Sequence, residues 1–336
     1  MWIDLLQLIN FRSYGKRSFR LKEGTNLITG PNGAGKTNLL EAILFASTTA
    51  SHRTSGNSKL LREGEEAFSV KAGAFGRKGR FRVEVVYRKG SGTKVRVNSS
   101  PVKRESLLAG FPAVMFSPED IDVVKGPPSG LRRMFNINIC QLCPRYTAGL
   151  IKYRRALQER NTALKKGGTA GLEPWTGILR KYSEELTGER KRFLERLGRV
   201  MREVAGEIGL ESPPEIHYRP SRYRESSLEK DIEAGFTTWG PHRDIFIFLE
   251  SGRNMRDTGS RGQARMAAIL YRVSLWRMLR ESSGTEPVFL MDDVFSELDP
   301  EKRRLVAGCV SARQTLLTAA RPPEELEGKA NVIRLR

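Results

Sequence analysis

Short runs of apolar residues broken by turn residues predict a β-rich N-terminal region. Residues 1–30 predict two short strands and a third, at 27–29, that leads into a glycine-rich turn. Residues 37–47 carry apolar side chains at helical spacing and predict a helix. Two further β-rich stretches are predicted at 66–75 and 80–98. The order of strand, turn, helix and strands indicates the start of an α/β fold.

The pattern changes in the middle of the chain. An apolar run at 113–116 predicts a buried strand, which the Ser-Pro pair after it ends. From about 129 to 209 the chain predicts heavily charged helices, with breaks expected near 167–168 and 173–174. Strand-like patterns return near 215–220, after two consecutive prolines. This segment therefore reads as a helical insertion.

The C-terminal part returns to an α/β pattern. A strand predicted at 245–249 precedes a helix–strand–helix–strand run over the rest of the chain. There is no internal repeat and no long heptad run, so we expect no coiled-coil arm. The expected domains are 1–125, 126–235 and 236–336, and the first and last of these form one α/β body.

Composition limits the class of protein. The 336 residues are 39% hydrophobic, which is typical of a globular chain large enough for two lobes. No apolar run approaches the ~20 residues of a membrane span and no signal peptide is visible, so we expect a cytoplasmic protein without a membrane partner. The net charge of +20 favours a polyanionic partner. Cys140 and Cys143 form a C-x-x-C, but no second pair completes a zinc site.

A phosphate-binding motif follows the third predicted strand. The segment GPNGAGKT, 30–37, matches G-x-x-x-x-G-K-[ST] in full, with a strand before it and a helix after it. Inward-turned backbone N–H groups and the positive helix end bind phosphates in such a loop. We expect Lys36 to reach the β- and γ-phosphates of ATP and Thr37 to ligate Mg²⁺. The candidate nucleotide-binding residues are Gly30, Pro31, Asn32, Gly33, Ala34, Gly35, Lys36, Thr37 and Asn38.

An acidic pair follows a short apolar strand at 287–291. Carboxylates at the end of a buried strand are typical of a Walker B site. We expect Asp292 to hold Mg²⁺ and Asp293 to orient water or act as a general base. With Lys36, these two aspartates are the candidate catalytic residues.

A second candidate anion site opens the helix predicted from Ala264 to about Arg280. Ser260 is its expected N-cap, and a glycine follows two residues later. A single P-loop does not need this second site, but in a dimer of ATP-binding cassettes it caps the γ-phosphate held by the other copy. The candidate residues of this signature segment are Ser260, Arg261, Gly262 and Gln263, and those of a following D-loop are Ser296 and Asp299. The motifs together predict an ABC-type P-loop ATPase head with an inserted, mostly helical second domain.

The motifs resemble one family in particular. Residues 10–14, NFRSY, and the segment GPNGAGKTNLLEAI resemble the heads of RecF, SMC and Rad50 proteins together. Further segments resemble the RecF family alone: HRTSGNSKLLREGEEA (52–67), FSPEDIDVVKGPPS (116–129), YRRALQERNTALKK (153–166), TTWGPHRD (237–244) and MDDVFSELDPEKRR (291–304). These segments are spread over nearly the whole chain.

Three positions depart from the RecF pattern. Gly259 stands where the family usually has Leu, Asn136 where it has Asp, and Ile245 where it has a second Asp. His242 and Arg243 lie in a RecF-like segment, and we expect them either near the nucleotide site or in a structural role.

The resemblance implies a function that composition does not show. It implies an ATP-dependent homodimer that binds double-stranded DNA, prefers single-strand/duplex junctions, and works with RecR and RecO to load RecA at gaps coated by single-strand-binding protein. We also expect slow, DNA-stimulated ATP hydrolysis, because Asp293 is one methylene shorter than the Glu usual in transport cassettes and no His follows the strand at 314–318. Candidate DNA-binding residues are Arg53, Lys59, Arg62, Lys152, Arg154 and Arg155. Alternatives at this point are the ATPase subunit of a transporter, a P-loop kinase, and a DNA-binding scaffold that does not hydrolyse ATP.

Overall fold

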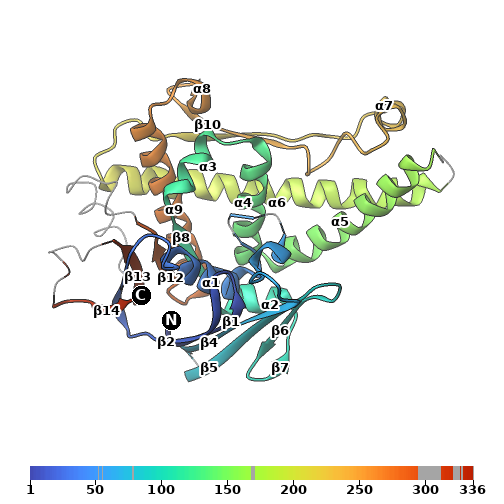
Figure 1. The fold of residues 1–336 in the computed structure, drawn as a ribbon. Coiled ribbons are helices and arrows are strands. Elements are labelled where there is room, and N and C mark those ends of the chain that lie inside the picture. The colour runs from blue at the N-terminus through green and yellow to red at the C-terminus, as the bar shows by residue number, and fades with distance from the viewer. Residues whose placement is uncertain are drawn as a thin grey trace. The chain divides into compact units, whose positions relative to one another are not determined.

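The chain forms two compact units in the computed structural model (Figure 1). The structure describes residues 1–336 except 52, 55, 78, 168–170, 294–311, 321–325, 327 and 336. The first unit comprises residues 1–120 and 268–336, and the second comprises residues 121–267. The chain therefore leaves the first unit once and returns to it later, which is the organisation of an insertion.

An antiparallel sheet forms one layer of the first unit, in the strand order β2-β1-β4-β5-β6-β7. Its strands are β1 (Trp2–Phe11), β2 (Tyr14–Arg20), β4 (Ala67–Gly76), β5 (Gly79–Arg88), β6 (Gly92–Val97) and β7 (Ser100–Pro101). Alternate residues of a strand point to opposite faces, and Leu6, Val70 and Val85 are buried on one face. The strands and the hairpin between β5 and β6 confirm the predicted β-rich region.

A parallel sheet forms the second layer, in the order β14-β3-β13-β12-β8. Its strands are β3 (Gly24–Thr29), β8 (Ala113–Phe116), β12 (Val288–Met291), β13 (Gln314–Ala319) and β14 (Asn331–Arg334). Because β13 pairs with both β3 and β12, the loops after these two strands emerge at the same edge of the sheet. This order positions the candidate site.

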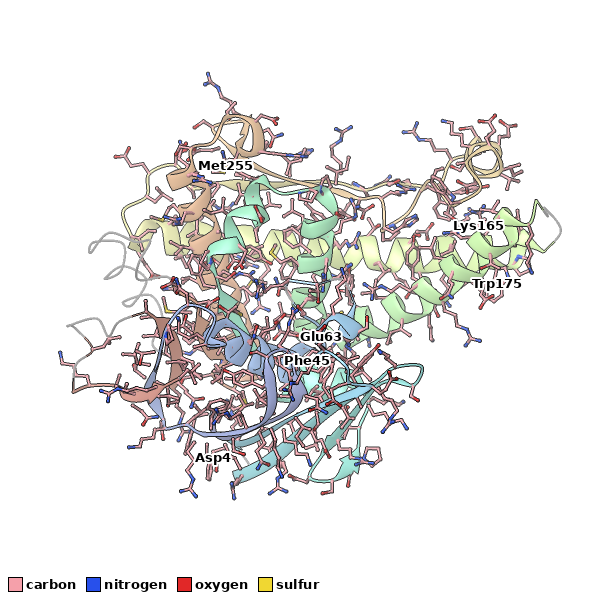
Figure 2. The ribbon with its side chains drawn as sticks, viewed as in Figure 1. Asp4, Phe45, Glu63, Lys165, Trp175 and Met255 are labelled. Atoms are coloured by element: carbon pink, nitrogen blue, oxygen red, sulfur yellow. The ribbon has the colours of Figure 1, made fainter. Side chains whose placement is uncertain are left out.

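The helix α1 (Lys36–Thr48) lies between the two sheets. Phe45 packs against Phe11 of β1 and Phe68 of β4, with ring centroids 6.1 and 5.2 Å apart, and appears within the core of the unit in Figure 2. The helix also contacts β8 and β13 of the parallel sheet. Residues on both sides of α1 are therefore apolar and buried, as expected for a core helix.

The remaining elements of the first unit are short, apart from part of one long helix. They are η1 (Asn57–Leu60), α2 (Arg104–Gly110), η2 (Pro118–Asp120) and the portion from residue 268 onward of α9 (Arg261–Ser283). On α9, Arg272 forms a buried ion pair with Asp120, with N···O distances of 2.5 and 3.1 Å. The indole N–H of Trp276 donates to the carbonyl oxygen of Pro287 at 3.1 Å. These contacts anchor α9 to the segment that follows β8 and to the segment that precedes β12.

Helices dominate the second unit. They are α3 (Ile121–Lys125), α4 (Pro128–Leu142), α5 (Pro144–Lys165), α6 (Leu172–Glu207), α7 (Ser227–Ala234) and α8 (Met255–Thr258). A small antiparallel sheet has the order β11-β10-β9, with β9 (Glu215–Arg219), β10 (Ile245–Glu250) and β11 (Arg253–Asn254). The predicted helical character of this region is confirmed.

The helices α5 and α6 pair as an antiparallel hairpin. Arg160 of α5 donates to the Thr176 hydroxyl at 2.9 Å, and Arg190 of α6 donates to the Tyr146 hydroxyl at 3.0 Å. Both arginines are almost fully buried. The pairing of α5 with α6 gives no heptad pattern in the sequence. Arg160 and Arg190 lie in the interface, where a coiled coil has apolar side chains.

Two details differ from the sequence-based expectations. The break expected at 173–174 is wrong, because α6 begins at Leu172 and holds Pro174 in its first turn, where the backbone N–H needs no helical partner. The second unit also extends beyond the expected boundary at 235. Residues 236–267 belong to it because β10 pairs with β9, a contact between strands that are distant in sequence.

Candidate nucleotide site

The loop after β3 requires glycine at two positions. A Cβ added at Gly30 would lie 2.7 Å from the carbonyl oxygen of Leu335, and one added at Gly35 would lie 2.8 Å from the Tyr14 hydroxyl oxygen. Both residues also have positive φ, 155° and 94°. The loop is therefore held close to its neighbours in a conformation that larger residues disfavour.

Two side chains hold the loop from opposite ends. The Lys36 ammonium donates to the carbonyl oxygens of Gly30 at 2.8 Å and Pro31 at 3.0 Å. The Tyr14 hydroxyl donates to the carbonyl oxygen of Gly35 at 3.0 Å. Burial raises the pKa of Tyr14 to about 12, so the phenol keeps its proton and its donor role at neutral pH. The cationic group of Lys36 thus lies against the start of the loop.

The carboxylate after β12 lies beside two hydroxyl groups. Asp292 Oδ1 accepts a hydrogen bond from the Thr318 hydroxyl at 2.7 Å, and the Thr37 side chain lies close enough to lower the pKa of the carboxyl. Burial raises the pKa of Asp292, the negative charges of Glu119 and Asp293 raise it further, and the two hydroxyls oppose the rise. The structure therefore brings together Thr37 and Asp292, which the sequence assigns to the same metal ion.

Thr318 is a site residue that the sequence analysis did not identify. It lies at the end of β13, between the strands that carry the two motifs. Its hydroxyl donates to Asp292 and accepts from the backbone N–H of Asp293 at 2.8 Å. Asp293 itself has a φ of 46°, in the left-handed region. In the sequence, Thr318 is recognisable only as a hydroxyl residue near the end of an apolar strand. The sheet order is needed to show that it lies next to Asp292 and Asp293.

The donor set at this edge suits Mg²⁺. A threonine hydroxyl and a carboxylate are hard oxygen ligands. In the part of the chain that the structure describes, no group of three or more His, Cys, Asp and Glu residues could hold a metal ion. Mg²⁺ usually binds through one or two carboxylates plus substrate phosphates and water. Thr37 and Asp292 therefore fit a metal that arrives with a nucleotide.

A buried ion pair connects α1 to the segment around residue 53. The Arg12 guanidinium donates to both oxygens of the fully buried Glu41, at 2.9 and 3.0 Å. The Ser51 hydroxyl also donates to Glu41, and its oxygen accepts from the backbone N–H of Arg53 at 3.0 Å. Arg53 in turn forms an ion pair with Glu119 at 3.5 Å. Arg53, one of the expected DNA-binding residues, therefore pairs with a carboxylate whose charge also raises the pKa of Asp292.

The expected DNA-binding residues form two sets. Arg53, Lys59 and Arg62 are exposed in the first unit, whereas the other set is exposed on α5 of the second unit. That second set consists of Lys152, Arg154 and Arg155. The Lys152 ammonium lies 5.6 Å from the centre of the Tyr182 ring, as in a cation–π contact.

The signature segment forms a capping box at the start of α9. The backbone N–H of Gln263 donates to the Ser260 hydroxyl at 3.1 Å, and Gln263 Oε1 accepts from the backbone N–H of Ser260 at 2.7 Å. This confirms Ser260 as the N-cap. All four signature residues are exposed. The expected D-loop residues Ser296 and Asp299 lie outside the described residues.

The RecF-like segment 237–244 has a structural role in the second unit. Asp244 is fully buried and accepts from Arg190, from the Tyr218 hydroxyl and from the backbone N–H of Ser221. His242 accepts from the Tyr153 hydroxyl through Nδ1 at 2.6 Å and donates from Nε2 to a backbone carbonyl at 3.0 Å. Burial lowers the pKa of His242 to about 4, so the ring is neutral. These contacts link the segment to α5 and α6.

The C-x-x-C has no metal-binding geometry. Cys140 is buried on α4, and Cys143 caps α5 by accepting from the backbone N–H of Tyr146 at 3.4 Å. Burial raises the pKa of the Cys143 thiol, which disfavours the thiolate. Both cysteines therefore act as small structural residues.

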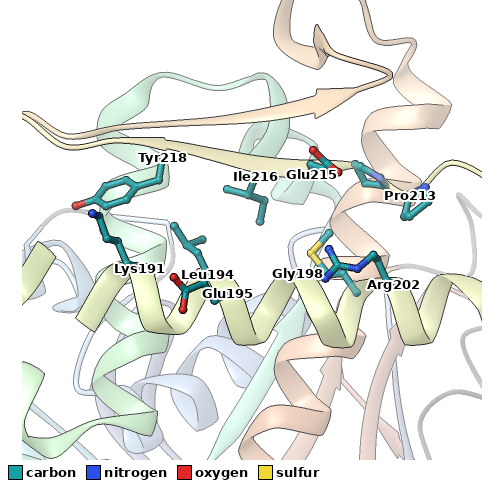
Figure 3. A pocket seen from close by; sticks show the side chains of 11 residues that line it. Lys191, Leu194, Glu195, Gly198, Arg202, Pro213, Glu215, Ile216 and Tyr218 are labelled. Atoms are coloured by element: carbon teal, nitrogen blue, oxygen red, sulfur yellow. The ribbon is translucent and has the colours of Figure 1, made fainter. Parts of the chain in front are cut away.

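A groove of about 540 Å³ lies between α6 and β9 in the second unit (Figure 3). Lys191 and Arg202 line it together with Glu195 and Glu215. Two bases and two acids balance one another, so the groove has no preferred ligand charge.

Comparison with known proteins decides the family. Residues 2–324 match the model of the family described as RecF/RecN/SMC N terminal domain. The chain is 32% identical to the DNA replication and repair protein RecF of Agathobacter rectalis, over 99% of this chain and 96% of the relative. It is 33% identical to RecF of Clostridium novyi, over 95% and 92%. The chain belongs to the RecF family.

Solved structures agree with the membership in the RecF family. The recombination mediator protein RecF-ATPrS in the RecFOR pathway has a TM-score of 0.87 and 30% identity, with 100% of this chain and 96% of that chain covered. RecF-ATP in the same pathway has a TM-score of 0.86 and 31% identity, with coverage of 96% and 93%. An SMC head bound to part of ScpA, at 15% identity and a TM-score of 0.54 over 99% and 94%, shares the fold. The predicted fold of an ABC-type ATPase head is confirmed.

The three departures from the RecF pattern have local explanations. A Cβ at Gly259 would lie 2.7 Å from the carbonyl oxygen of Met255, so a leucine does not fit where α8 ends in this way. Asn136 Oδ1 accepts from Arg190 at 2.8 Å and from Tyr146 at 2.5 Å, so the amide supplies the acceptor. Ile245 is exposed at the start of β10. None of these positions belongs to the loop after β3.

The helices do not have membrane-spanning character. Within the described residues, none combines the length and the apolar composition that a bilayer crossing needs.

Proposed function

We propose that this chain is an ATP-dependent DNA-binding protein of replication and recombinational repair. Its RecF relatives are named DNA replication and repair proteins, and the similar solved structures are RecF with ATP or ATPrS. The observation that carries the proposal is the sheet order, in which β13 pairs with both β12 and β3. It places Asp292, at the end of the acidic strand, at the same sheet edge as the phosphate-binding loop.

In this proposal the loop 30–38 binds the phosphates of ATP through its backbone N–H groups. Lys36 exchanges its two carbonyl partners for the β- and γ-phosphate oxygens, which are stronger acceptors because they are charged. Thr37 and Asp292 hold Mg²⁺, which neutralises phosphate charge when it is bound. Burial raises the pKa of Asp292, and a cation beside the carboxylate would lower that pKa and favour the charged form.

The ATP-bound form is proposed to be a homodimer. The exposed Ser260–Gln263 segment presents a helix N-terminus to the γ-phosphate held by a second copy. Loss of the γ-phosphate removes this anion and weakens the dimer. A coupling of ~1–3 kcal/mol, the usual allosteric range, changes affinity by about 5–150-fold. Ser296 and Asp299 are proposed to lie at the same dimer interface.

Hydrolysis is proposed to be slow and stimulated by DNA, so that it resets the dimer on DNA. Asp293 is the candidate water-orienting carboxylate, and its side chain is one methylene shorter than the glutamate common at this position in transport cassettes. The next strand ends in Thr318 and Ala319 without a histidine. This set of residues suits slow hydrolysis that limits the lifetime of the dimer on DNA, rather than rapid repeated turnover.

The DNA partner is proposed to be duplex DNA next to single-strand gaps, where the dimer helps RecR and RecO to load RecA. The net charge of +20 supports a polyanionic partner held mainly through phosphates. Binding should therefore weaken steeply with salt and show little sequence preference.

The Asp293→Asn variant tests this function. We expect it to bind ATP and to dimerise, but to hydrolyse ATP more slowly and to dissociate from gapped duplex DNA at least several-fold more slowly than wild type. Dissociation is measured after addition of competitor DNA, with Lys36→Ala as the control that binds ATP poorly. Equal dissociation of Asp293→Asn and wild type in ATP would contradict the proposal.

A further inference from the structure

The antiparallel sheet of the first unit has one face that none of the described elements of this unit covers. Leu6, Val70 and Val85 point to the face that packs on α1. Residues at the alternate positions point to the other face, where Asp4 lies at the outer side of the sheet in Figure 2. In Figure 1, α1 and α2 lie on one side of β1, β4, β5 and β6, and no labelled helix of this unit lies on the opposite side.

Strand pairing collects basic residues on this open face. The register places Arg20 opposite Leu5, Gly73 opposite Arg82, and Val86 opposite Lys94. Opposed residues in a sheet point to the same side. The bases that share the face are Lys16, Arg20, Lys71, Arg80, Arg82, Arg88, Lys94 and Arg96. We call this set the basic sheet face.

Acidic residues neutralise only part of this set. Asp4 forms an ion pair with Arg80 at 2.7 Å, and Glu84 forms ion pairs with Lys71 at 3.0 Å and Arg96 at 3.7 Å. The other bases are exposed and form no ion pair with a described residue; they are Lys16, Arg20, Arg82, Arg88 and Lys94. The excess positive charge is therefore concentrated on β2, β5 and β6.

The chemistry of this face suits phosphates better than a protein partner. A specific protein interface needs an apolar centre, but on the described part of these strands Ile9 is the one large apolar side chain that is exposed, whereas Trp2, Leu5 and Phe75 on the same face are half-buried. Neighbouring strands are ~4.8 Å apart, so β2 to β6 carry the bases over a width of about 20 Å. A face of this width can lie along a DNA duplex. The duplex phosphates, with one charge per ~1.7 Å of axis, then meet several of the bases.

We propose that the basic sheet face contacts the phosphate backbone of duplex DNA. This inference rests on the proposed DNA-binding function and assigns a surface to it. It adds a set of contacts to the six residues that the sequence suggested, none of which lies on this face. The sequence did not reveal the basic sheet face, because its residues lie on four strands within a stretch of 81 residues. They become neighbours only through the strand register.

The test neutralises three exposed bases that have no ion-pair partner among the described residues. The variant Arg20→Ser/Arg82→Ser/Lys94→Ser is compared with Arg199→Ser/Arg222→Ser/Lys230→Ser, which removes the same charge from exposed positions of the second unit. Duplex affinity is measured in ATP at several salt concentrations. We expect the first variant to bind about tenfold or more weakly and to lower the salt slope by about 2–3, with the control close to wild type.

Two outcomes separate this inference from the proposed function. If wild type does not bind duplex DNA in ATP, the proposed function fails and this inference fails with it. If wild type binds and the Arg20/Arg82/Lys94 variant keeps the same affinity and slope, the inference alone is overturned, and an acidic protein becomes the expected partner of this face. ATP binding by the variant serves as the folding control, and Arg82→Glu alone provides a second, smaller perturbation.

Discussion

The two units use buried carboxylates in different ways. Asp244 in the second unit accepts from a guanidinium, a phenol and a backbone N–H, so its charge is satisfied within the fold. Asp292 in the first unit is held by hydroxyls and lies near two further carboxylates, with no cationic partner among the described residues. The difference separates a structural anion from one that retains the capacity to bind a metal ion.

The same contrast applies to motif residues in general. The segment TTWGPHRD resembles the RecF family in particular, yet its His242 and Asp244 are occupied by contacts that link α5 and α6. A family-specific segment is therefore not by itself a reactive site.

Asp244→Asn should give the largest loss of stability. The amide leaves the buried Arg190 without a counter-charge, and breaking a buried ion pair in this way costs about 3–5 kcal/mol. Urea unfolding followed by tryptophan fluorescence measures the change, because Trp239 is buried in the same unit.

The matched control is Asp292→Asn, the same chemical change in the other unit. Burial raises the pKa of Asp292, so neutralising this carboxyl should change stability by less than about 1 kcal/mol while hydrolysis is lost. Equal destabilisation by the two substitutions would remove the distinction between a structural and a functional carboxylate.

Acid should weaken the second unit through His242. Its pKa is about 4 in the fold and about 6.5 when unfolded, so the unfolded chain takes up the proton first as the pH falls. Stability from this group is complete above pH 6.5 and is lost progressively down to about pH 4. The expected loss between pH 7 and pH 5 is about 1–2 kcal/mol.

The measurement is urea unfolding at pH 7 and pH 5 for wild type and His242→Gln, with His217→Gln as the control at an exposed position. The substitution at His242 should flatten the pH dependence between these two values, and the one at His217 should not. An unchanged pH dependence in His242→Gln would contradict the assignment.

Local sequence predicted most of the candidate nucleotide site. The strand, the glycine-rich loop and α1 are consecutive in the chain, so spacing alone identified the phosphate-binding motif that contains Lys36. Asp292 followed from the same reasoning, because a short apolar strand ends directly before it. The capping box at Ser260 is also local, since its two partners are three residues apart.

Features that depend on distant pairing could not be predicted. Thr318 acquires its role because β13 lies between β3 and β12, which only the sheet order shows. The pairing of α5 with α6 uses buried arginines, which a hydrophobic pattern treats as surface residues. The bases on the sheet face likewise become a surface only through strand register.

The central claim is that two copies of the chain share a nucleotide between the loop of one copy and the exposed start of α9 of the other. Sedimentation velocity with ATP, ADP or no nucleotide, each with and without gapped duplex DNA, tests it most directly. Gly262→Glu is the matched variant, because Gly262 has ordinary φ and no atom closer than 3.8 Å to an added Cβ. The account predicts a dimer with ATP alone, and a monomer that still binds ATP for Gly262→Glu. A chain that sediments identically in all three nucleotide states, or a Gly262→Glu variant that dimerises like wild type, would contradict it.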